Sequence, residues 1–282
     1  MPRRQKKQIP SSGRIKTVII LSVSSDIGTH LALKYLERGF RVIGTYRNRA
    51  HVAALEGQKN CHLFSCDLSH GEGLNDFVHQ VGDRKISWDI FISCAGQPLP
   101  VMPFFECDFD EWSASVHVNA IEQLRALHML YPCRNKKGAH AVFFAGGGMN
   151  GTVKNFSAYT ISKIMLAKMC EFLDAENRSL NVFIVGPGWT KTKIHNTILA
   201  DKRTARAKAS ETKDFLKDKA GTSLDDIYEC IDWLCAEGRS LAGGRNFSVV
   251  YDGWRKGRRE KLKKALKSDP DMYKLRRSGN ER

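Results

Sequence analysis

Short apolar runs alternate with amphipathic stretches along most of the chain. The first run, residues 17–23, precedes a polar turn, a helical pattern over residues 27–38 that stops at Gly39, and a second apolar run over residues 41–45. A glycine directly after a periodic segment is typical of a helix C-terminus. The pattern therefore predicts a β-α-β unit at the start of the chain.

The same order continues to the end of the apolar pattern. Further strands are expected at residues 62–65, 88–93, 140–144, 181–185 and 247–251. Strands that alternate with helices form a parallel sheet with helices on both faces. We expect an α/β fold with a doubly wound, Rossmann-like parallel sheet, and a ligand at the carboxyl ends of its strands.

Length and charge favour one domain with basic extensions. A chain of 282 residues that is 42% hydrophobic can bury one substantial core. Residues 1–16 carry six Lys or Arg and no acid, and residues 254–282 carry twelve against four acids, so the ends hold +14 of the net +15. We expect a basic N-terminal tail over 1–16, a dinucleotide-binding and catalytic domain over 17–253, and a basic C-terminal extension over 254–282.

The remaining composition indicates an unexported protein. No apolar run reaches the roughly 20 residues that cross a bilayer, and the basic start lacks the apolar stretch of a signal peptide. The eight cysteines are scattered, without the C-x-x-C pairs of zinc sites. We expect a cytoplasmic protein with reduced thiols, no metal site and no membrane span.

Two basic segments are open to more than one interpretation. Residues 191–219 are rich in Lys and Arg and form either a mobile lid over a substrate or ordinary solvated surface. In the C-terminal extension, residues 261–267 are helical in pattern, and Ser268-Asp269-Pro270 is typical of a second helix start. The basic side chains favour an anionic substrate only weakly, since most charge runs are solvated.

Tyr159-Thr-Ile-Ser-Lys163 is the strongest chemical signal in the chain. In a helix, residues i and i+4 lie on the same face, so a phenol and an ammonium are neighbours. A phenol with a pKa near ~10 is a poor base at neutral pH, and a nearby cation favours its phenolate. The pair is a candidate for proton transfer, although a surface Tyr-Lys pair has the same spacing.

The order of these elements resembles the short-chain dehydrogenases/reductases. Leu21-Ser-Val-Ser-Ser-Asp-Ile-Gly28 resembles their T-G-x-x-x-G-I-G turn, with Ser22 and Asp26 in place of two glycines, and Tyr159/Lys163 matches their Y-x-x-x-K. Four further stretches resemble the family's x-D-L, N-N-A-G, V-N-A and P-G-x-x-x-T elements: Cys66-Asp67-Leu68, Ser93-Cys94-Ala95-Gly96, Val118-Asn119-Ala120 and Pro187-Gly188-Trp189-Thr190-Lys191-Thr192.

The resemblance implies roles for three catalytic candidates. Tyr159 would exchange the proton with the substrate oxygen, Lys163 would favour the phenolate and hold the nicotinamide ribose, and Asn119 would help position a relay water. A mid-helix asparagine without such a role is the alternative for Asn119. The implied cofactor contacts come from Ser22, Ser24, Ser25, Ile27, Gly28, Arg47, Asp67, Leu68, Ala95, Gly96, Tyr159, Lys163, Pro187, Gly188, Thr190 and Thr192.

The end of the second strand favours NADP(H) over NAD(H). An acidic residue there would hold the ribose 2′-hydroxyl of NAD, but the chain has Tyr46 and then Arg47. A guanidinium, with the Ser24 hydroxyl nearby, suits a 2′-phosphate by charge and by geometry. The alternative is that Arg47 and Arg49 form a solvated basic corner.

The main departure from the family lies upstream of Tyr159. Gly146 occupies the position of the serine that hydrogen-bonds the substrate oxygen, and the loss of one such donor typically costs 10² to 10³ in rate. A backbone N–H of Gly147 or Gly148, or the side chain of Asn150, is a candidate replacement.

Three functions follow from these features. The first is an NADP(H)-dependent oxidoreductase that acts on a carbonyl or alcohol of a small molecule; the second is a catalytically weakened NADP(H)-binding sensor or scaffold. The third, a polyanion-binding module, is disfavoured by the near-neutral middle of the chain, so no nucleic-acid partner is expected. The resemblance implies a homodimer or homotetramer, in which Leu166, Met169 and Phe172 either line the interface or serve the core.

Overall fold

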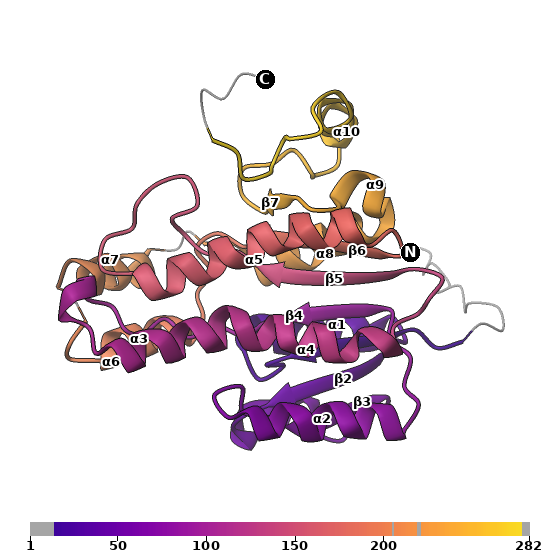
Figure 1. Ribbon diagram of the computed structural model, residues 1–282, viewed down its shortest axis with the longest axis horizontal. Helices are drawn as coiled ribbons and strands as arrows, with labels where there is room; N and C mark the ends of the chain where they lie inside the picture. Colours follow the sequence, from indigo (N-terminus) through magenta and orange to yellow (C-terminus); the bar gives the residue numbers. More distant parts are fainter. Residues whose placement is uncertain (1–13, 205, 219–220, 278–282) are drawn as a thin grey trace, which may run out of the picture.

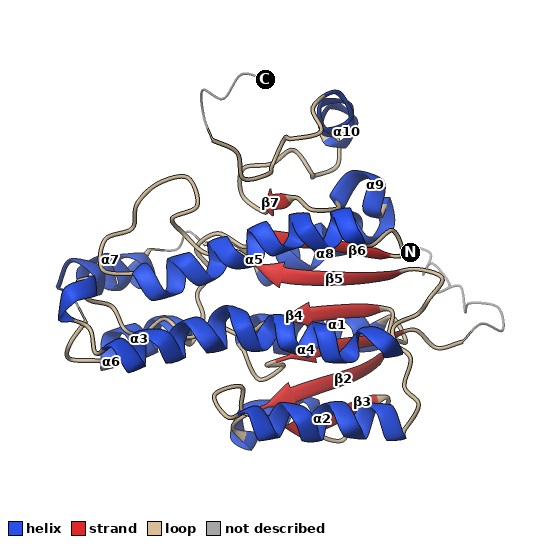
Figure 2. Ribbon diagram, viewed as in Figure 1, coloured by secondary structure: helices blue, strands red, loops and turns tan. Residues whose placement is uncertain are grey.

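Seven parallel strands form one sheet at the centre of the molecule. The computed structural model describes residues 14–204, 206–218 and 221–277. Within them the strand order is β3-β2-β1-β4-β5-β6-β7, and every neighbouring pair is parallel (Figure 2). The strands are β1 (Thr17–Leu21), β2 (Arg41–Tyr46), β3 (Cys61–Ser65), β4 (Ile90–Ser93), β5 (Ala139–Phe144), β6 (Leu180–Gly186) and β7 (Asn246–Ser248).

Helices cover both faces of this sheet (Figure 1). Successive residues of β1 point to opposite faces, so Val18 and Ile20 belong to one core cluster and Ile19 and Leu21 to the other. The helices are α1 (Asp26–Glu37), α2 (Gly71–Asp83), α3 (Phe109–Val116), α4 (Glu122–Leu130), α5 (Ser157–Glu176), α6 (Ile194–Ala200), α7 (Arg206–Lys217), α8 (Leu224–Glu237), α9 (Arg239–Ala242) and α10 (Arg259–Ser268). Core residues of α1, α8 and α10 meet one face, and those of α2, α4 and α5 meet the other.

The predicted α/β class is confirmed, and three strand boundaries are corrected. β1 ends at Leu21 rather than at residue 23. β4 begins at Ile90 rather than at residue 88, because the buried Asp89 carboxylate accepts the Thr17 N–H at 2.8 Å and Trp88 forms only an isolated bridge. β7 ends at Ser248 rather than at residue 251. The Ser248 hydroxyl accepts the N–H groups of Val250 and Tyr251, and these bonds turn the chain away from the sheet.

The described part of the C-terminal extension packs on the domain. Leu262 and Leu266 of α10 are buried in the core cluster beside α8. The buried Arg245 guanidinium donates hydrogen bonds to the carbonyls of Leu241, Leu266 and Met272, which joins α9, α10 and the segment after α10. Charge-assisted bonds of this kind are stronger than neutral ones, so this cation serves the fold.

The helix start predicted at residues 268–270 is wrong. α10 ends at Ser268, and no helix follows it within the described residues. The Asp269 carboxylate accepts the N–H groups of Asp271 and Met272, which is a turn that competes with a helix. The backbone therefore continues as a turn and an extended segment.

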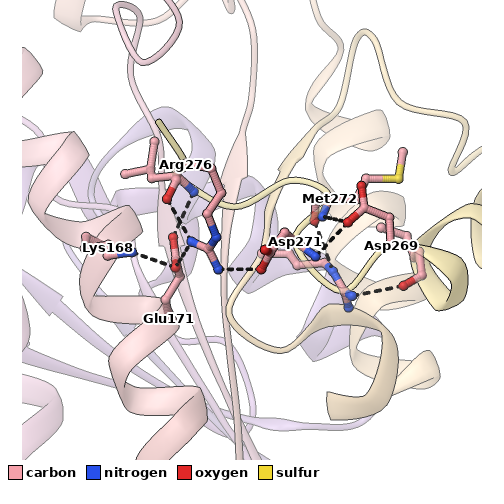
Figure 3. Close-up of polar contacts among 9 residues, drawn as sticks. Lys168, Glu171, Asp269, Asp271, Met272 and Arg276 are labelled. Atoms are coloured by element: carbon pink, nitrogen blue, oxygen red, sulfur yellow. Dashed lines mark hydrogen bonds and ion pairs between the residues drawn. The ribbon is translucent and has the colours of Figure 1, made fainter. Parts of the chain in front are cut away.

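Glu171 of α5 fastens this segment to the helix that also carries Tyr159 (Figure 3). Its carboxylate accepts hydrogen bonds from the Leu275 N–H at 2.9 Å, the Arg276 guanidinium at 2.6 Å and the Lys168 ammonium at 2.8 Å. Although partial burial acts to raise it, these bonds lower the pKa of Glu171. The tail of the chain is thus joined to the site helix.

The N-terminal tail predicted over 1–16 falls mostly outside the described residues. Its described end, Arg14, pairs with the Asp89 carboxylate at 2.5 Å. Among the described helices, none has both the length and the apolar character that crossing a bilayer requires.

Candidate active site

A cleft of about 1220 Å³ opens at the carboxyl ends of the central strands. The strand arrows in Figure 2 point toward this side of the sheet, where α3, α6 and α7 also lie. The loops after β4, β5 and β6 line the cleft, together with α5 and the α6–α7 region. The position is the one that the strand pattern predicts for a ligand.

The turn after β1 keeps a tight geometry despite its missing glycines. Ser22 adopts a left-handed conformation, with φ of 55°, at the position of the family's first glycine. The Ser25 hydroxyl caps α1 by accepting the Gly28 N–H at 3.0 Å. A Cβ on Gly28 would lie 2.7 Å from the Ser22 carbonyl oxygen, so only glycine fits there. The start of α1 is therefore held as the dinucleotide fold requires.

Arg47 is exposed at the end of β2, where the sequence predicts the 2′-phosphate contact. The Asp67 carboxylate after β3 accepts the N–H and the hydroxyl of Ser69. Partial burial acts to raise it, but these bonds and the charge of Arg47 lower the pKa of Asp67. The two predicted adenosine-side residues are therefore close enough to interact electrostatically.

Asn119 and Gln123 hold the loop after β4 against the cleft. The buried Asn119 amide accepts the Gln97 N–H at 2.8 Å and donates to the Gln97 carbonyl at 2.7 Å. Gln123 donates to the Ala95 carbonyl at 3.3 Å and to the Asn119 carbonyl at 2.8 Å. Asn119 lies in a π-helical turn, His117–Ile121, that precedes α4. The side chain of Asn119 is thus committed to positioning this loop.

Tyr159 and Lys163 project from α5 into the cleft. The Lys163 ammonium lies 5.5 Å from the centroid of the Tyr159 ring and donates to the Ala95 carbonyl at 3.3 Å. Burial lowers the pKa of Lys163 from 10.5 to about 8, and it raises the pKa of Tyr159 to about 12. The shift of Tyr159 comes from burial, and the expectation that Lys163 favours its phenolate stays a prediction.

Gly146 packs directly against Tyr159. A Cβ at residue 146 would lie 2.4 Å from Cε1 of Tyr159 and 3.0 Å from Cγ of Lys163. Real Cβ contacts are never that short, so the tyrosine ring fills the space of the family's serine side chain. The position of the Tyr159 ring therefore requires a glycine at residue 146.

The three candidates for a replacement donor lie beside this contact. Gly147, Gly148 and Asn150 all line the cleft. The N–H groups of Gly147 and Gly148 donate to no acceptor within the described chain. A Cβ on Gly147 would have room, since the nearest atom, Cγ2 of Val153, would lie 4.0 Å away. Gly147 therefore keeps a backbone N–H without an acceptor and tolerates a small side chain.

The loop after β6 forms the opposite wall. Pro187, Gly188, Thr190 and Thr192 line the cleft as predicted. The Thr190 hydroxyl oxygen is buried without a hydrogen-bond partner among the described residues, although the Thr190 carbonyl pairs with Nε2 of His195 at 3.0 Å. An orphaned hydroxyl here fits a polar ligand group such as a carboxamide.

Aromatic rings continue this wall into α6 and α7. The Trp189 ring is parallel to the His195 ring, with centroids 5.8 Å apart, and its centroid lies 4.6 Å from that of Phe215. The Lys208 ammonium lies 4.8 Å from the Trp189 ring centroid and pairs with Glu211 at 2.9 Å. The region 191–219, proposed as a lid or as solvated surface, thus includes side chains that line the cleft.

The structure brings about half of the predicted site residues to the cleft. Those that line it are Ile27, Ala95, Gly96, Tyr159, Lys163, Pro187, Gly188, Thr190 and Thr192. Those that do not are Ser22, Ser24, Ser25, Gly28, Arg47, Asp67, Leu68 and Asn119. The aromatic wall and Gln123 were missed; no spacing rule marks them, and only the position of Trp189 inside the P-G-x-x-x-T stretch gave a hint.

Comparison with known proteins decides the family. A family model described as enoyl-(acyl carrier protein) reductase matches residues 22–253, which is most of the chain. This chain belongs to the short-chain dehydrogenases/reductases. It is an NAD(P)-dependent oxidoreductase of that family, and the family binds a nicotinamide cofactor.

Curated dehydrogenases and reductases are similar to this chain over much of its length. The serine 3-dehydrogenase of Rhizobium radiobacter is 22% identical over 240 residues, which cover 80% of this chain and 90% of that protein. The NADPH-dependent pterin aldehyde reductase of Arabidopsis thaliana is 23% identical over 186 residues, covering 64% and 76%. Both identities are low, so these relatives support the family and not a particular substrate.

Solved structures share the fold of this family member. A short-chain dehydrogenase/reductase of Saccharomyces cerevisiae superposes with a TM-score of 0.75 at 19% identity, covering 85% of this chain and 98% of that one. A short-chain dehydrogenase of Shigella flexneri 2a, complexed with NADP, has a TM-score of 0.70 at 22% identity, covering 83% and 96%. At such identities the likeness is one of fold.

We predict that Lys163→Met stabilises the protein at pH 7. Because its pKa falls from 10.5 to about 8 on folding, the buried ammonium lowers the free energy of unfolding at neutral pH, by roughly 3 kcal/mol at most. Between pH 8 and 10.5 the folded protein releases a proton that the unfolded chain keeps, so wild-type stability rises with pH. Urea unfolding without nucleotide should show an advantage of the variant that shrinks across this range.

The matched control is Lys168→Met, which removes a half-exposed ammonium from the same helix. It should change stability by less than about 1 kcal/mol at any of these pH values. A Lys163→Met variant that is less stable than wild type at pH 7 would contradict the prediction.

We predict that Gly146→Ser harms this enzyme. The new Cβ must displace the Tyr159 ring, and such overpacking should lower the free energy of unfolding by about 1–3 kcal/mol. Turnover should fall with it, because the phenol moves. The measurements are urea unfolding and steady-state rates. Gly147→Ser is the control, because it introduces the same side chain where the nearest atom to a Cβ is 4.0 Å away. A stable and faster Gly146→Ser enzyme would show the contact to be unimportant.

Proposed function

We propose that this protein is an NADP(H)-dependent oxidoreductase that interconverts a carbonyl and an alcohol on a small molecule. The observation that carries the proposal is the pairing of Tyr159 and Lys163 on one face of α5, inside a cleft at the strand ends. Two loops that match the family's cofactor elements, after β4 and after β6, line the same cleft, together with Ile27 at the start of α1. The chemistry and the cofactor would therefore meet at the Tyr159 hydroxyl.

The residues of the chain divide the work of this reaction. When bound, the nicotinamide group supplies or accepts the hydride. Tyr159 exchanges the proton at the substrate oxygen. Burial raises its pKa to about 12, so the phenol is protonated at neutral pH and its ionisation needs a stabilising charge nearby. Lys163 places a cation 5.5 Å from that ring, where it stabilises negative charge that develops on the phenol oxygen. The Gly147 N–H is positioned to donate to the substrate oxygen in place of the missing serine.

Several residues would hold the nicotinamide cofactor. The amides at the start of α1, within the turn from Ser22 to Gly28, suit the diphosphate, while Ala95 and Gly96 leave room for the ribose. Thr190 and Thr192 suit the carboxamide. Asn119, whose side chain anchors the loop after β4, is proposed to position that loop and to support the proton relay.

Arg47 supports NADP(H) rather than NAD(H). Its guanidinium is exposed at the end of β2, has no hydrogen bond to another described residue and faces no acid on β2 itself. A free guanidinium recognises a phosphate by charge and by its forked donors. The NADP complex of the Shigella protein and the NADPH-dependent Arabidopsis relative agree with this preference.

The wall opposite the catalytic pair supports an anionic substrate with an apolar body. Phe156 packs on Tyr159 with ring centroids 4.8 Å apart, and the Lys208 ammonium lies 5.6 Å from the Phe156 ring centroid and 4.8 Å from the Trp189 ring centroid. This ammonium is shared with Glu211 at 2.9 Å, and it has further donors for a carboxylate or phosphate that is attached to an apolar group.

A catalytically weakened NADP(H)-binding sensor or scaffold is the second candidate. Gly146 favours it, because the family's serine donor is absent. The pairing of Tyr159 with Lys163 favours the enzyme. A homodimer or homotetramer and a cytoplasmic location stay predictions; of the residues suggested for an interface, Leu166 belongs to the core, whereas Phe172 is 52% exposed.

We predict that the protein binds NADPH more tightly than NADH, and that Arg47→Ala removes the difference. Loss of a charge-assisted phosphate contact should weaken NADPH binding about 10- to 100-fold and leave NADH unchanged. The measurement is nicotinamide fluorescence during titration. Arg49→Ala is the control, since Arg49 is equally exposed but pairs with Glu56 at 2.7 Å. Absence of binding by either nucleotide would refute the proposed function.

We predict that Gly147→Pro lowers turnover by about 10²- to 10³-fold by removing one backbone donor. Gly147→Ala keeps the N–H and has space for its methyl group, so its rate should stay near wild type. Single-turnover rates with a carbonyl substrate found by screening measure the effect. Equal rates for the two variants would show that the donor lies elsewhere, for example at Asn150, and no turnover by wild type would favour the sensor.

A further inference from the structure

Asp26 and Lys193 join two loops that lie far apart in the sequence. The Lys193 N–H donates to Oδ2 of Asp26 at 2.6 Å across 167 residues. The Lys193 ammonium lies 3.5 Å from Oδ1 of the same carboxylate and donates to the Ser24 carbonyl at 3.0 Å. The loop after β6 is therefore fastened onto the turn after β1.

The aspartate is an unusual residue for this place. It occupies the position of the family's second glycine, in the first turn of α1. The helix dipole stabilises a carboxylate there, but the same dipole is what attracts a ligand diphosphate to a helix N-terminus. An unpaired Asp26 would therefore repel the cofactor, and Lys193 supplies the opposite charge.

The lysine has capacity left for a ligand. An ammonium has three donors, and two of those of Lys193 face Asp26 and Ser24. Its side chain is 45% exposed, beside the turn whose amides begin α1. The third donor is thus available to an anion at the start of α1, which is where this fold places a diphosphate.

We propose that Lys193 is a ligand of the dinucleotide diphosphate, and that the Asp26 side chain holds the loop that carries it by accepting the Lys193 N–H. The inference rests on the proposed NADP(H) function. Where relatives of the family let the diphosphate approach a glycine, this chain uses a cation held by a carboxylate. In this chain the charge of Lys193 would then bind the diphosphate, where the glycine of relatives lets the diphosphate come close to the backbone.

The test is a set of four variants titrated with NADPH. Lys193→Met should weaken binding about 10- to 100-fold, whereas Lys193→Arg should stay within about threefold of wild type. Asp26→Asn removes the negative charge and keeps an acceptor for the Lys193 N–H, so its affinity should equal or exceed that of wild type. The double variant Asp26→Asn/Lys193→Met should remain several-fold weaker than Asp26→Asn alone.

Two outcomes would overturn the inference. If Lys193→Met binds NADPH as wild type does, the lysine is no ligand. If the double variant recovers the affinity of Asp26→Asn, Lys193 only neutralises the aspartate. Thermal unfolding of each variant shows whether it is folded, and binding of adenosine 2′-monophosphate, which lacks a diphosphate, should be unchanged in all of them.

The same titrations separate this inference from the proposed function. If wild type binds no NADPH, the proposed function fails and the inference falls with it. If wild type binds NADPH and Lys193→Met loses the diphosphate contact, both stand. Tight binding by every variant leaves the proposed function in place and removes Lys193 from the site.

Discussion

The contact between Gly146 and the Tyr159 ring is the constraint on which the site depends. Because no Cβ fits at residue 146 without moving it, the Tyr159 ring packs against this glycine, and the stem of Lys163 packs on the same residue. Lys163 is buried and Tyr159 is partly buried at the wall of the cleft, and burial is the first cause of the shift in both pKa values. We expect a donor for the substrate oxygen from the backbone of the glycine-rich loop or from the side chain of Asn150. The glycine at residue 146 therefore affects where Tyr159 and Lys163 lie, how far their pKa values shift and which group can donate to the substrate oxygen.

Much of the fold follows from the sequence for simple reasons. Buried parallel strands are continuous apolar runs separated by amphipathic helices, and this pattern survives local noise. The boundaries fail where one polar side chain redirects the backbone, as Asp89 does before β4 and Ser248 does after β7. The helix predicted after Ser268 fails likewise, because the Asp269 side chain closes a turn instead.

The site divides in the same way. Tyr159 and Lys163 are predictable because four residues of helix place them together. The pairing of Asp26 with Lys193, the wall around Trp189 and the fit of Tyr159 on Gly146 depend on tertiary contacts between distant segments. No local spacing encodes them, and a glycine in place of a serine looks like a simple loss until the ring that occupies its space is seen.

The basic C-terminal extension also has a different meaning in three dimensions. Several of its cations are paired within the domain: Arg255 with Asp226, Lys263 with Glu237 and Arg276 with Glu171. The sequence suggests that these basic residues belong to an appendage, but several of them form ion pairs that attach the extension to the domain. Exposed pairs of this kind contribute little individually, so the buried Arg245 and the apolar side of α10 carry most of the attachment.

The tail also changes what the sheet presents to other molecules. β7 is the last strand of the sheet, and an edge strand offers unpaired backbone groups to any extended chain that approaches it. Here the Asn246 N–H already donates to the Tyr273 carbonyl at 2.8 Å. A second copy or a misfolded neighbour that added a strand at this edge would first have to displace the chain's own tail. The extension thus covers part of this edge, so that a strand added beside β7 would compete with the Tyr273 carbonyl for the Asn246 N–H.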